Sequence, residues 1–318
     1  MSRRKLRIAL QLYAAPGAWP GLWRKSCQAL RTGGLIGLWR SVRTKLAQPG
    51  LPVGEAEKAV LRSLAYEDRW TGHGESARHR VSAVILSREQ ALLDASLASI
   101  GKSVLRSARL EILVVSNGGS LRIPPVYPFP LRLLREKCPF NWSAYNNLAA
   151  RQSGGEFLLF LNDDVEALHG GWLDAMLEAG LQPGVGAVGA KLLYPGGLVQ
   201  HWGIKVGGDE GEASHLHKFQ RRDWPGENGE LLRVRRVDAV TGACLLTPRG
   251  LFLEMGGFDE RFALSYNDVD YCLRLRQAGL AVVVTPHAEL VHKETATRSW
   301  KVRPREKRLF REKWGHLL

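Results

Sequence analysis

Residues 157–166 read FLLFLNDDVE, an apolar run that stops abruptly on Asn162, Asp163 and Asp164. A short, continuous run of this kind is typical of a buried strand in a parallel sheet. Adjacent carboxylates repel each other unless a cation or hydrogen-bond donors neutralise them. Two interpretations follow. The acids form an exposed turn that caps a helix beginning near Gly170, or they bind Mg²⁺ or Mn²⁺, which prefer carboxylate oxygens and substrate phosphates.

Strand and helix patterns alternate on both sides of this run. Continuous apolar strands separated by helices predict an α/β fold, in which a mainly parallel sheet is covered on both faces. Ligands of such sheets bind at the carboxyl ends of the strands, where the acids of 157–166 lie. The predicted strands are 81–87, 111–117, 131–134, 157–163, 281–286 and 288–291, and the predicted helices are 89–100, 143–152 capped by Ser143, and 268–278.

The basic residues of the chain are concentrated at its two ends. The 318 residues carry a formal charge of +14, of which residues 1–50 hold +10 and residues 293–318 hold +6, which leaves −2 for the centre. A near-neutral centre without a reader motif argues against nucleic-acid binding, whereas anionic lipid headgroups suit basic ends. Four scattered cysteines without metal-type spacing suggest buried thiols in a reducing compartment.

The first 75 residues predict a basic amphipathic helical extension and a linker. Residues 22–46 mix tryptophan and leucine with regularly placed cations, which fits either a helix pair at a lipid interface or a basic arm packed on the protein. The opening 18 residues imitate a signal peptide, but Gln11 and Tyr13 dilute the apolar run and we expect no export. No stretch of 18 uninterrupted apolar residues predicts a transmembrane helix.

A second group of polar residues lies in 256–292. Asn267 is predicted to cap the helix over 268–278, which places Asp268 and Asp270 in the first turn. Acids in a first turn also interact favourably with the helix dipole, so a structural role for them stays open. His292 follows the predicted strands at the end of this region, where it is either a structural residue or a metal ligand.

Several segments in this order resemble the family-2 glycosyltransferases, inverting enzymes of the GT-A fold. The resemblance rests on FLLFLNDDVE, PFNWSAYNNLAA, AVTGACLLTPRGLFLEMGGFDERF and YNDVDYCLRLRQAG. Residues 190–243 are similar to bacterial, rhamnosyltransferase-like members that build O-antigen, capsule or exopolysaccharide. The resemblance covers about residues 80–315. It implies a GT-A domain over 80–318 that ends in a basic helix.

The same resemblance implies roles for individual residues. Asp164 and His292 would bind Mn²⁺ or Mg²⁺, and Asp268 would be the general base. The chain departs from the family pattern at Ser116, Asn267 and Lys293, where the family has an aspartate, a glutamate and a second histidine. The residues implied to bind the nucleotide sugar are Ser87, Asn117, Asn146, Asn162 and Asp163.

The mechanism that the resemblance implies is transfer with inversion at the anomeric carbon. Asp268 would accept the proton of the acceptor hydroxyl, while the metal neutralises the departing diphosphate. Asp270, His201 and Trp202 are assigned to the acceptor side, although a tryptophan in the core is the common alternative. The glycine-rich stretch 206–218 is either a mobile loop on that side or a plain surface insertion.

The implied partners are a UDP- or dTDP-sugar donor, a glycan or lipid-linked acceptor, and an anionic membrane surface that binds the basic ends. This places the protein in the cytoplasm, on the inner face of the bacterial membrane. A nucleotidyltransferase would also use acids and metal, but 81–90 lacks the phosphate-cradling glycine loop with a lysine. Because of the departures at Ser116 and Asn267, a degenerate, non-catalytic protein also stays an alternative.

Overall fold

The computed structural model of the chain describes residues 79–118, 120–207, 212–294 and 302–318. The predicted extension over 1–75 and the first residues of the predicted C-terminal helix lie outside the described residues. No helix in the described ranges is both long and apolar enough to cross a membrane.

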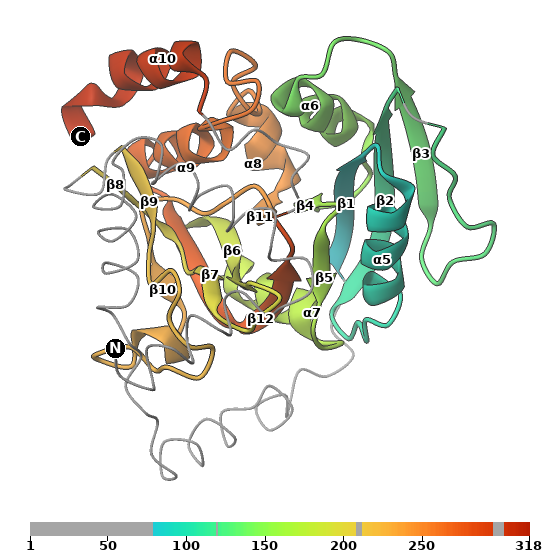
Figure 1. The fold of residues 1–318 in the computed structure, drawn as a ribbon, viewed down its shortest axis with the longest axis horizontal. Coiled ribbons are helices and arrows are strands. Elements are labelled where there is room, and N and C mark those ends of the chain that lie inside the picture. Colours follow the sequence, from blue (N-terminus) through green and yellow to red (C-terminus); the bar gives the residue numbers. More distant parts are fainter. Residues whose placement is uncertain (1–78, 119, 208–211, 295–301) are drawn as a thin grey trace, which may run out of the picture.

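The described residues are built around one large mixed sheet (Figure 1). Its strands run in the order β10-β12-β6-β11-β4-β1-β2-β3, with β5 added to β12 and β7 added to β6. Strands β8 and β9 form a separate hairpin. The bounds are β1 His79–Ser87, β2 Ala108–Asn117, β3 Leu131–Glu136, β4 Phe157–Asn162, β5 Val165–Ala167, β6 Val185–Leu193, β7 Val199–His201, β8 Ile204–Val206, β9 Ala213–His215, β10 Arg235–Arg236, β11 Cys244–Pro248 and β12 Ala281–His292.

The strand directions place the ends of several strands at the same edge of the sheet. Strands β1 to β4 pair in parallel, and β6 pairs in parallel with β12, while β11 runs antiparallel between β4 and β6. The carboxyl ends of β1, β2, β4, β6 and β12 therefore lie at the same edge as the amino end of β11. This mixed, mainly parallel sheet with flanking helices confirms the predicted fold class.

Helices cover both faces of the sheet, as its apolar strands require. One apolar core packs α5 and α7 on the sheet, and the other packs α6, α8, α9 and α10. Alternate residues of β4 divide between these cores, with Leu159 and Leu161 facing α7, and Leu158 and Phe160 facing the other side. The helices are α5 Gln90–Ile100, α6 Trp142–Gln152, α7 Trp172–Gly180, α8 Arg249–Glu254, α9 Asn267–Gln277 and α10 Pro304–Trp314.

Two predicted helix caps are wrong. Helix α6 is capped by Asn141, whose side chain accepts from the N–H of Ala144, while the Ser143 hydroxyl donates to the carbonyl of Phe262. Helix α9 has no side-chain cap. It begins after Tyr266, whose φ of 63° turns the chain into the helix, and Asn267 is the first helical residue.

Two segments differ from the predicted elements. The two strands expected over 281–291 form one strand, β12, with a register irregularity between Thr285 and Glu289. The expected loop 206–218 contains the second strand of the β8–β9 hairpin, and residues 208–211 lie outside the described residues. Hydrogen bonds between β8 and β9 therefore order part of this stretch.

Candidate functional site

The two carboxylates after β4 point to different partners. The hydroxyl of Ser87, at the end of β1, donates to Asp163 Oδ2 at 2.7 Å. Asp164 instead lies beside His292, with 3.2 Å between Asp164 Oδ1 and His292 Nε2. The carboxylates of Asp163 and Asp164 therefore face different partners instead of each other. They do not cap α7 either, because β5 separates them from that helix and Gly171 is its N-cap.

Sheet pairing explains why Asp164 meets a residue 128 positions further along the chain. Strand β5 begins directly after Asp164 and pairs antiparallel with the end of β12, where Val165 lies opposite His292. The backbone N–H of Lys293 also donates to the carbonyl of Asp164 at 3.0 Å. Asp164 is 8% exposed and Asn162 Nδ2 lies 3.4 Å from His292 Nε2. Three residues predicted for the site thus form one polar cluster.

This cluster has the composition of a site for a hard divalent cation. A carboxylate oxygen and an imidazole nitrogen face each other, and such an arrangement is favourable when a proton or a cation lies between them. In the described ranges no three His, Cys, Asp or Glu side chains are grouped to hold an ion by themselves. Two protein ligands are sufficient for Mg²⁺ or Mn²⁺ when substrate phosphates and water complete the coordination. The residues present fit the implied metal.

Asp268 is linked to the same sheet edge through the residues that precede β11. The N–H of Gly242 donates to Asp268 Oδ2 at 2.8 Å, and the N–H of Val269 donates to Oδ1 at 2.8 Å. The next residue, Ala243, accepts at its carbonyl from the N–H of Asn162 at 3.0 Å. Neighbouring residues of one short segment therefore hold the predicted base and the start of the acidic motif.

The departures from the family pattern have different surroundings. Lys293, which replaces a second histidine, forms an ion pair with Glu166. Ser116 is buried at the end of β2. Asn267 accepts at Oδ1 from the N–H of Asp268, and its buried Nδ2 has no hydrogen-bond partner among the described residues.

One predicted nucleotide-sugar residue is not brought into the cluster, and a second is described only by its backbone. Asn146 is 1% exposed within α6, and its Nδ2 donates to the carbonyl of Trp142 one turn earlier at 2.9 Å. This contact gives it a structural role in the helix and argues against nucleotide contact. Asn117 is the last residue of β2, at the correct sheet edge, and its side chain lies outside what the structure describes.

The assignment of Asp270 to the acceptor side is wrong, because its carboxylate is fully buried. It accepts from the indole N–H of Trp314 at 2.9 Å, and it pairs with Lys313 at 2.7 Å and Arg274 at 3.0 Å. Trp314 and Lys313 join α10 to α9, while Arg274 pairs with Asp270 within α9. Asp270 therefore fastens the C-terminal helix instead of binding a sugar.

The assignment of His201 and Trp202 to the acceptor side is also wrong. Both side chains are 0% exposed, so neither ring has a face open to a sugar. His201 Nδ1 lies 2.9 Å from His215 Nδ1, and its Nε2 accepts weakly from the N–H groups of Gly203 and Thr241. Burial holds the pKa of His201 well below its usual range, so the ring is neutral.

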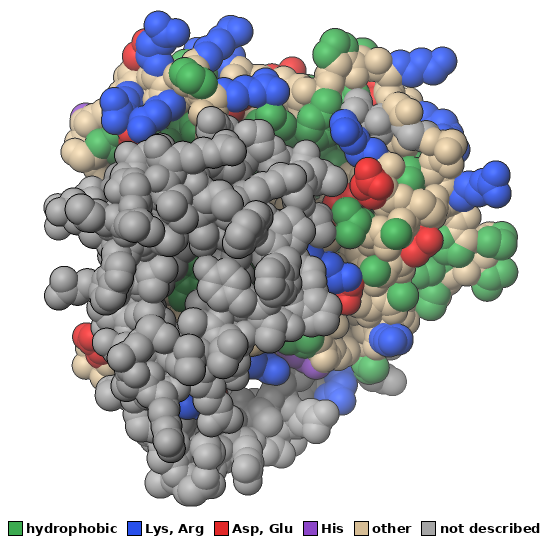
Figure 2. Space-filling view, viewed as in Figure 1, with side chains coloured by type: hydrophobic (Ala, Val, Ile, Leu, Met, Phe, Trp, Pro, Cys, Tyr) green, Lys and Arg blue, Asp and Glu red, His purple; other side chains and the backbone are tan. Residues whose placement is uncertain are grey.

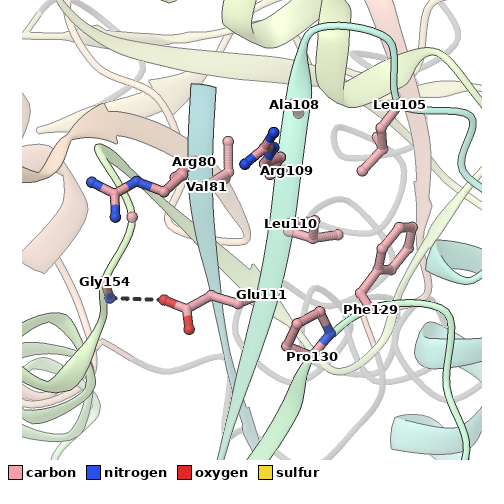
Figure 3. Close-up of a pocket in the computed structure, with 11 residues that line it drawn as sticks. Arg80, Val81, Leu105, Ala108, Arg109, Leu110, Glu111, Phe129, Pro130 and Gly154 are labelled. Carbon is pink, nitrogen blue, oxygen red and sulfur yellow. Dashed lines mark hydrogen bonds between the residues drawn. The ribbon is translucent and has the colours of Figure 1, made fainter. Parts of the chain in front are cut away.

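A cavity of about 560 Å³ lies at the opposite edge of the sheet (Figure 3). It is lined by residues at the amino ends of β1 and β2, including Arg80, Arg109 and Glu111, and by Phe129 before β3. Glu111 points to Gly154 and accepts from its N–H at 2.8 Å. None of the predicted site residues lines this cavity, so it is distinct from the acidic cluster.

Two residues of the site were missed in the sequence. Gln200 contacts His292 from β7, and Gly242 contacts Asp268 from the turn before β11. Gln200 directly precedes His201 in VQHWG, where the aromatic residues drew attention, and no local pattern marks it. Gly242 lies within AVTGA, which contributed to the resemblance without a role of its own.

Comparison with known proteins identifies the family of the chain. Residues 131–313 match the family described as Glycosyltransferase like family 2. The chain is 38% identical over 266 residues to the O-antigen biosynthesis protein RfbC of Myxococcus xanthus. This alignment covers 81% of this chain and 20% of that protein. It is 29% identical over 228 residues to an N-acetylglucosaminyl-diphospho-decaprenol L-rhamnosyltransferase of Mycobacterium tuberculosis. This second alignment covers 63% of this chain and 71% of that protein. The chain thus spans only a fifth of the length of RfbC.

Two solved structures share the fold. GalNAc-T7, solved with UDP, GalNAc and Mn²⁺, aligns with a TM-score of 0.54 at 13% identity, covering 69% of this chain and 45% of its own. The mannosyltransferase PcManGT of Pyrobaculum calidifontis, in complex with GDP-Man and Mn²⁺, aligns with a TM-score of 0.50 at 17% identity, covering 83% and 81%. With the matched family covering more than half of the sequence, the chain belongs to glycosyltransferase family 2 and has the GT-A fold.

Proposed function

We propose that the chain is a metal-dependent, inverting glycosyltransferase that moves a sugar from a nucleoside diphosphate to a hydroxyl of a glycan or lipid-linked glycan. The observation that carries the proposal is the link between Asp164, His292 and Asp268 at one sheet edge. Asn162 N and Asp268 Oδ2 bind neighbouring residues of the same segment, Ala243 and Gly242. A cation-binding pair and a base are therefore built into one framework.

Each polar group has a place in this reaction. A bound Mn²⁺ or Mg²⁺ would supply positive charge to the departing diphosphate. Asp164 and His292 would hold that ion, and Asp163, oriented by Ser87, would contact the nucleotide. The acceptor oxygen forms a bond to the anomeric carbon and gives its proton to Asp268, while the bond to the diphosphate breaks and its electron pair leaves with the diphosphate.

The donor is proposed to be a UDP- or dTDP-sugar used in cell-surface polysaccharide synthesis. Support comes from the relatives, whose names refer to O-antigen biosynthesis and rhamnosyl transfer. We place the protein on the cytoplasmic face of the membrane, where its basic ends would bind anionic lipid. The exposed side of α10 supports this, because Arg305 and Arg308 lie on it, and Figure 2 shows Lys and Arg side chains gathered where Figure 1 places α10.

A donor screen tests the catalytic proposal. The full chain is incubated with a panel of nucleotide sugars with and without Mn²⁺, and released nucleoside diphosphate is measured. We expect Mn²⁺-dependent release from one donor class, and its loss in Asp164→Asn. Asp268→Asn should retain donor affinity and lose transfer to an acceptor. No nucleotide or metal binding by the wild-type protein would reject the proposal and favour a degenerate family member.

Vesicle flotation tests the membrane proposal separately. We expect the full chain to float with vesicles containing anionic lipid, and less with neutral ones. The double variant Arg305→Glu and Arg308→Glu should float less with the anionic vesicles, since each cation near such a surface contributes about 1 kcal/mol. Equal flotation of variant and wild type would remove α10 from the proposed membrane contact.

A further inference from the structure

The buried side chain of Gln200 contacts His292 at two points. Gln200 is the central residue of β7 and is 4% exposed. Its Oε1 lies 2.7 Å from His292 Nδ1, and its Nε2 lies 3.3 Å from the backbone carbonyl oxygen of His292. One amide therefore contacts both the ring and the main chain of the same residue.

These two contacts determine where the ring carries its proton. The carbonyl of His292 can only accept, so the amide nitrogen of Gln200 must face it and the amide oxygen must face the ring. An oxygen at 2.7 Å from Nδ1 requires a proton on Nδ1. With its proton fixed on Nδ1, the ring can offer Nε2 to a cation, and without a cation a second proton on Nε2 can lie between that nitrogen and the carboxylate. This nitrogen lies 3.2 Å from Asp164 Oδ1.

We propose that Gln200 is a positioning residue that fixes the tautomer and the orientation of His292, so that Nε2 presents its lone pair beside Asp164 for a divalent cation. The inference rests on the function proposed above. The position of Asn162 supports this role of Gln200. Its amide nitrogen Nδ2, a donor, lies 3.4 Å from His292 Nε2, which suits a lone pair on that ring nitrogen. Histidines that bind metals commonly donate their other ring N–H in this way.

The choice of glutamine over glutamate has a physical reason. A glutamate at this position accepts from Nδ1 but cannot donate to the His292 carbonyl. It also buries a second negative charge near Asp164, which costs desolvation energy. An apolar residue of similar volume does neither and leaves Nδ1–H without its partner. Gln200→Glu is therefore the conservative variant that keeps the tautomer, and Gln200→Leu is the variant that loses it.

The first measurement uses metal-free, full-length protein labelled with ¹⁵N-histidine. The ring ¹⁵N shifts of His292, assigned by their absence in His292→Asn, report which nitrogen is protonated. We expect an Nδ1-protonated ring in wild type and in Gln200→Glu, and a mixture of tautomers in Gln200→Leu. Gln182→Leu, at an exposed glutamine just after α7 whose side chain donates to the carbonyl of Glu178, is the matched control and should match wild type. A wild-type ring that is protonated at Nε2 and bare at Nδ1 would overturn the proposal.

The second measurement is Mn²⁺ affinity in the presence of UDP, read by electron paramagnetic resonance of free Mn²⁺. We expect Gln200→Leu to weaken binding about 10- to 100-fold, the effect typical of residues that support a metal ligand. Gln200→Glu should recover most of this loss. Equal affinity in Gln200→Leu and wild type would overturn the proposal. If wild type binds no Mn²⁺, the proposed function fails, while the ring shifts still decide whether Gln200 sets the tautomer.

Discussion

Asp268 Oδ2 accepts a hydrogen bond from the backbone N–H of Gly242 at 2.8 Å. This bond orients the proposed base from the turn that leads into β11. A Cβ at position 242 would lie 2.7 Å from the ring of Trp142, which is 4% exposed and packs against Phe160 and Phe258. The ring cannot move aside easily, so a side chain at position 242 must displace the turn.

We therefore expect Gly242→Ala to lower the rate of transfer more than donor affinity. We expect kcat to fall roughly tenfold, which corresponds to a loss of about 1.4 kcal/mol of transition-state stabilisation. Steady-state kinetics and nucleotide titration of the same preparation measure the two effects. Gly250→Ala is the control, since a Cβ there meets nothing within 4 Å. Wild-type kcat in Gly242→Ala would show that the turn does not orient the base.

Asn267→Asp should shift the pH dependence of transfer. The new carboxylate would adjoin Asp268, and a like charge disfavours the ionised form of its neighbour, which raises the pKa of that neighbour. The base must be ionised to accept a proton, so the acidic limb of the kcat/KM profile should move to higher pH. An unchanged limb would mean that Asp268 does not set it. Glu260→Gln, at a side chain bonded to Asn147, serves as a distant control.

Asp270 should control stability and leave acceptor affinity unchanged. Its carboxylate is fully buried between Arg274, Lys313 and Trp314, so Asp270→Asn is expected to cost about 3 kcal/mol of unfolding free energy. Trp314→Phe, which removes one hydrogen bond to a charged group, should cost about 1.5 kcal/mol. Urea unfolding measures both, with Asp94→Asn on the exposed side of α5 as the control. A changed acceptor KM without a stability loss would restore the acceptor-side role.

His201 should make the protein less stable in mild acid. Burial lowers the pKa of this ring in the folded state, while the unfolded chain takes up a proton below its usual pKa of about 6.5. Stability is therefore fully present above about pH 6.5 and falls as the pH drops below it. Between pH 7.5 and pH 5.5 we expect the free energy of unfolding of wild type to fall by roughly 1 kcal/mol more than that of His201→Gln. Parallel losses in both proteins would exclude His201 as the cause.

The sequence was sufficient for the framework because buried parallel strands are continuous and apolar. FLLFLN and VSAVILS predicted β4 and β1 closely, and an abrupt change to carboxylates marked the functional edge. Helix starts were less predictable, since Asn141 and Ser143 are both good caps and only tertiary contact with Phe262 decides between them.

The site was predictable only where residue type carries the chemistry. Asp164 and His292 are adjacent because β5 pairs with the end of β12, a long-range register that no local pattern records. Burial overturned the roles of His201 and Asp270, since a polar residue in the core and one in a cleft look alike in sequence. Gln200 was invisible for the same reason.

The central claim is that Asp164 and His292 hold the metal that binds the donor diphosphate, across from Asp268. The most direct test is a crystal structure of the full chain with Mn²⁺ and UDP, with anomalous scattering used to locate the ion. The account predicts one manganese peak within coordinating distance of Asp164 and His292 Nε2, with the diphosphate between that peak and Asp268. A manganese and UDP site formed by other residues would contradict it.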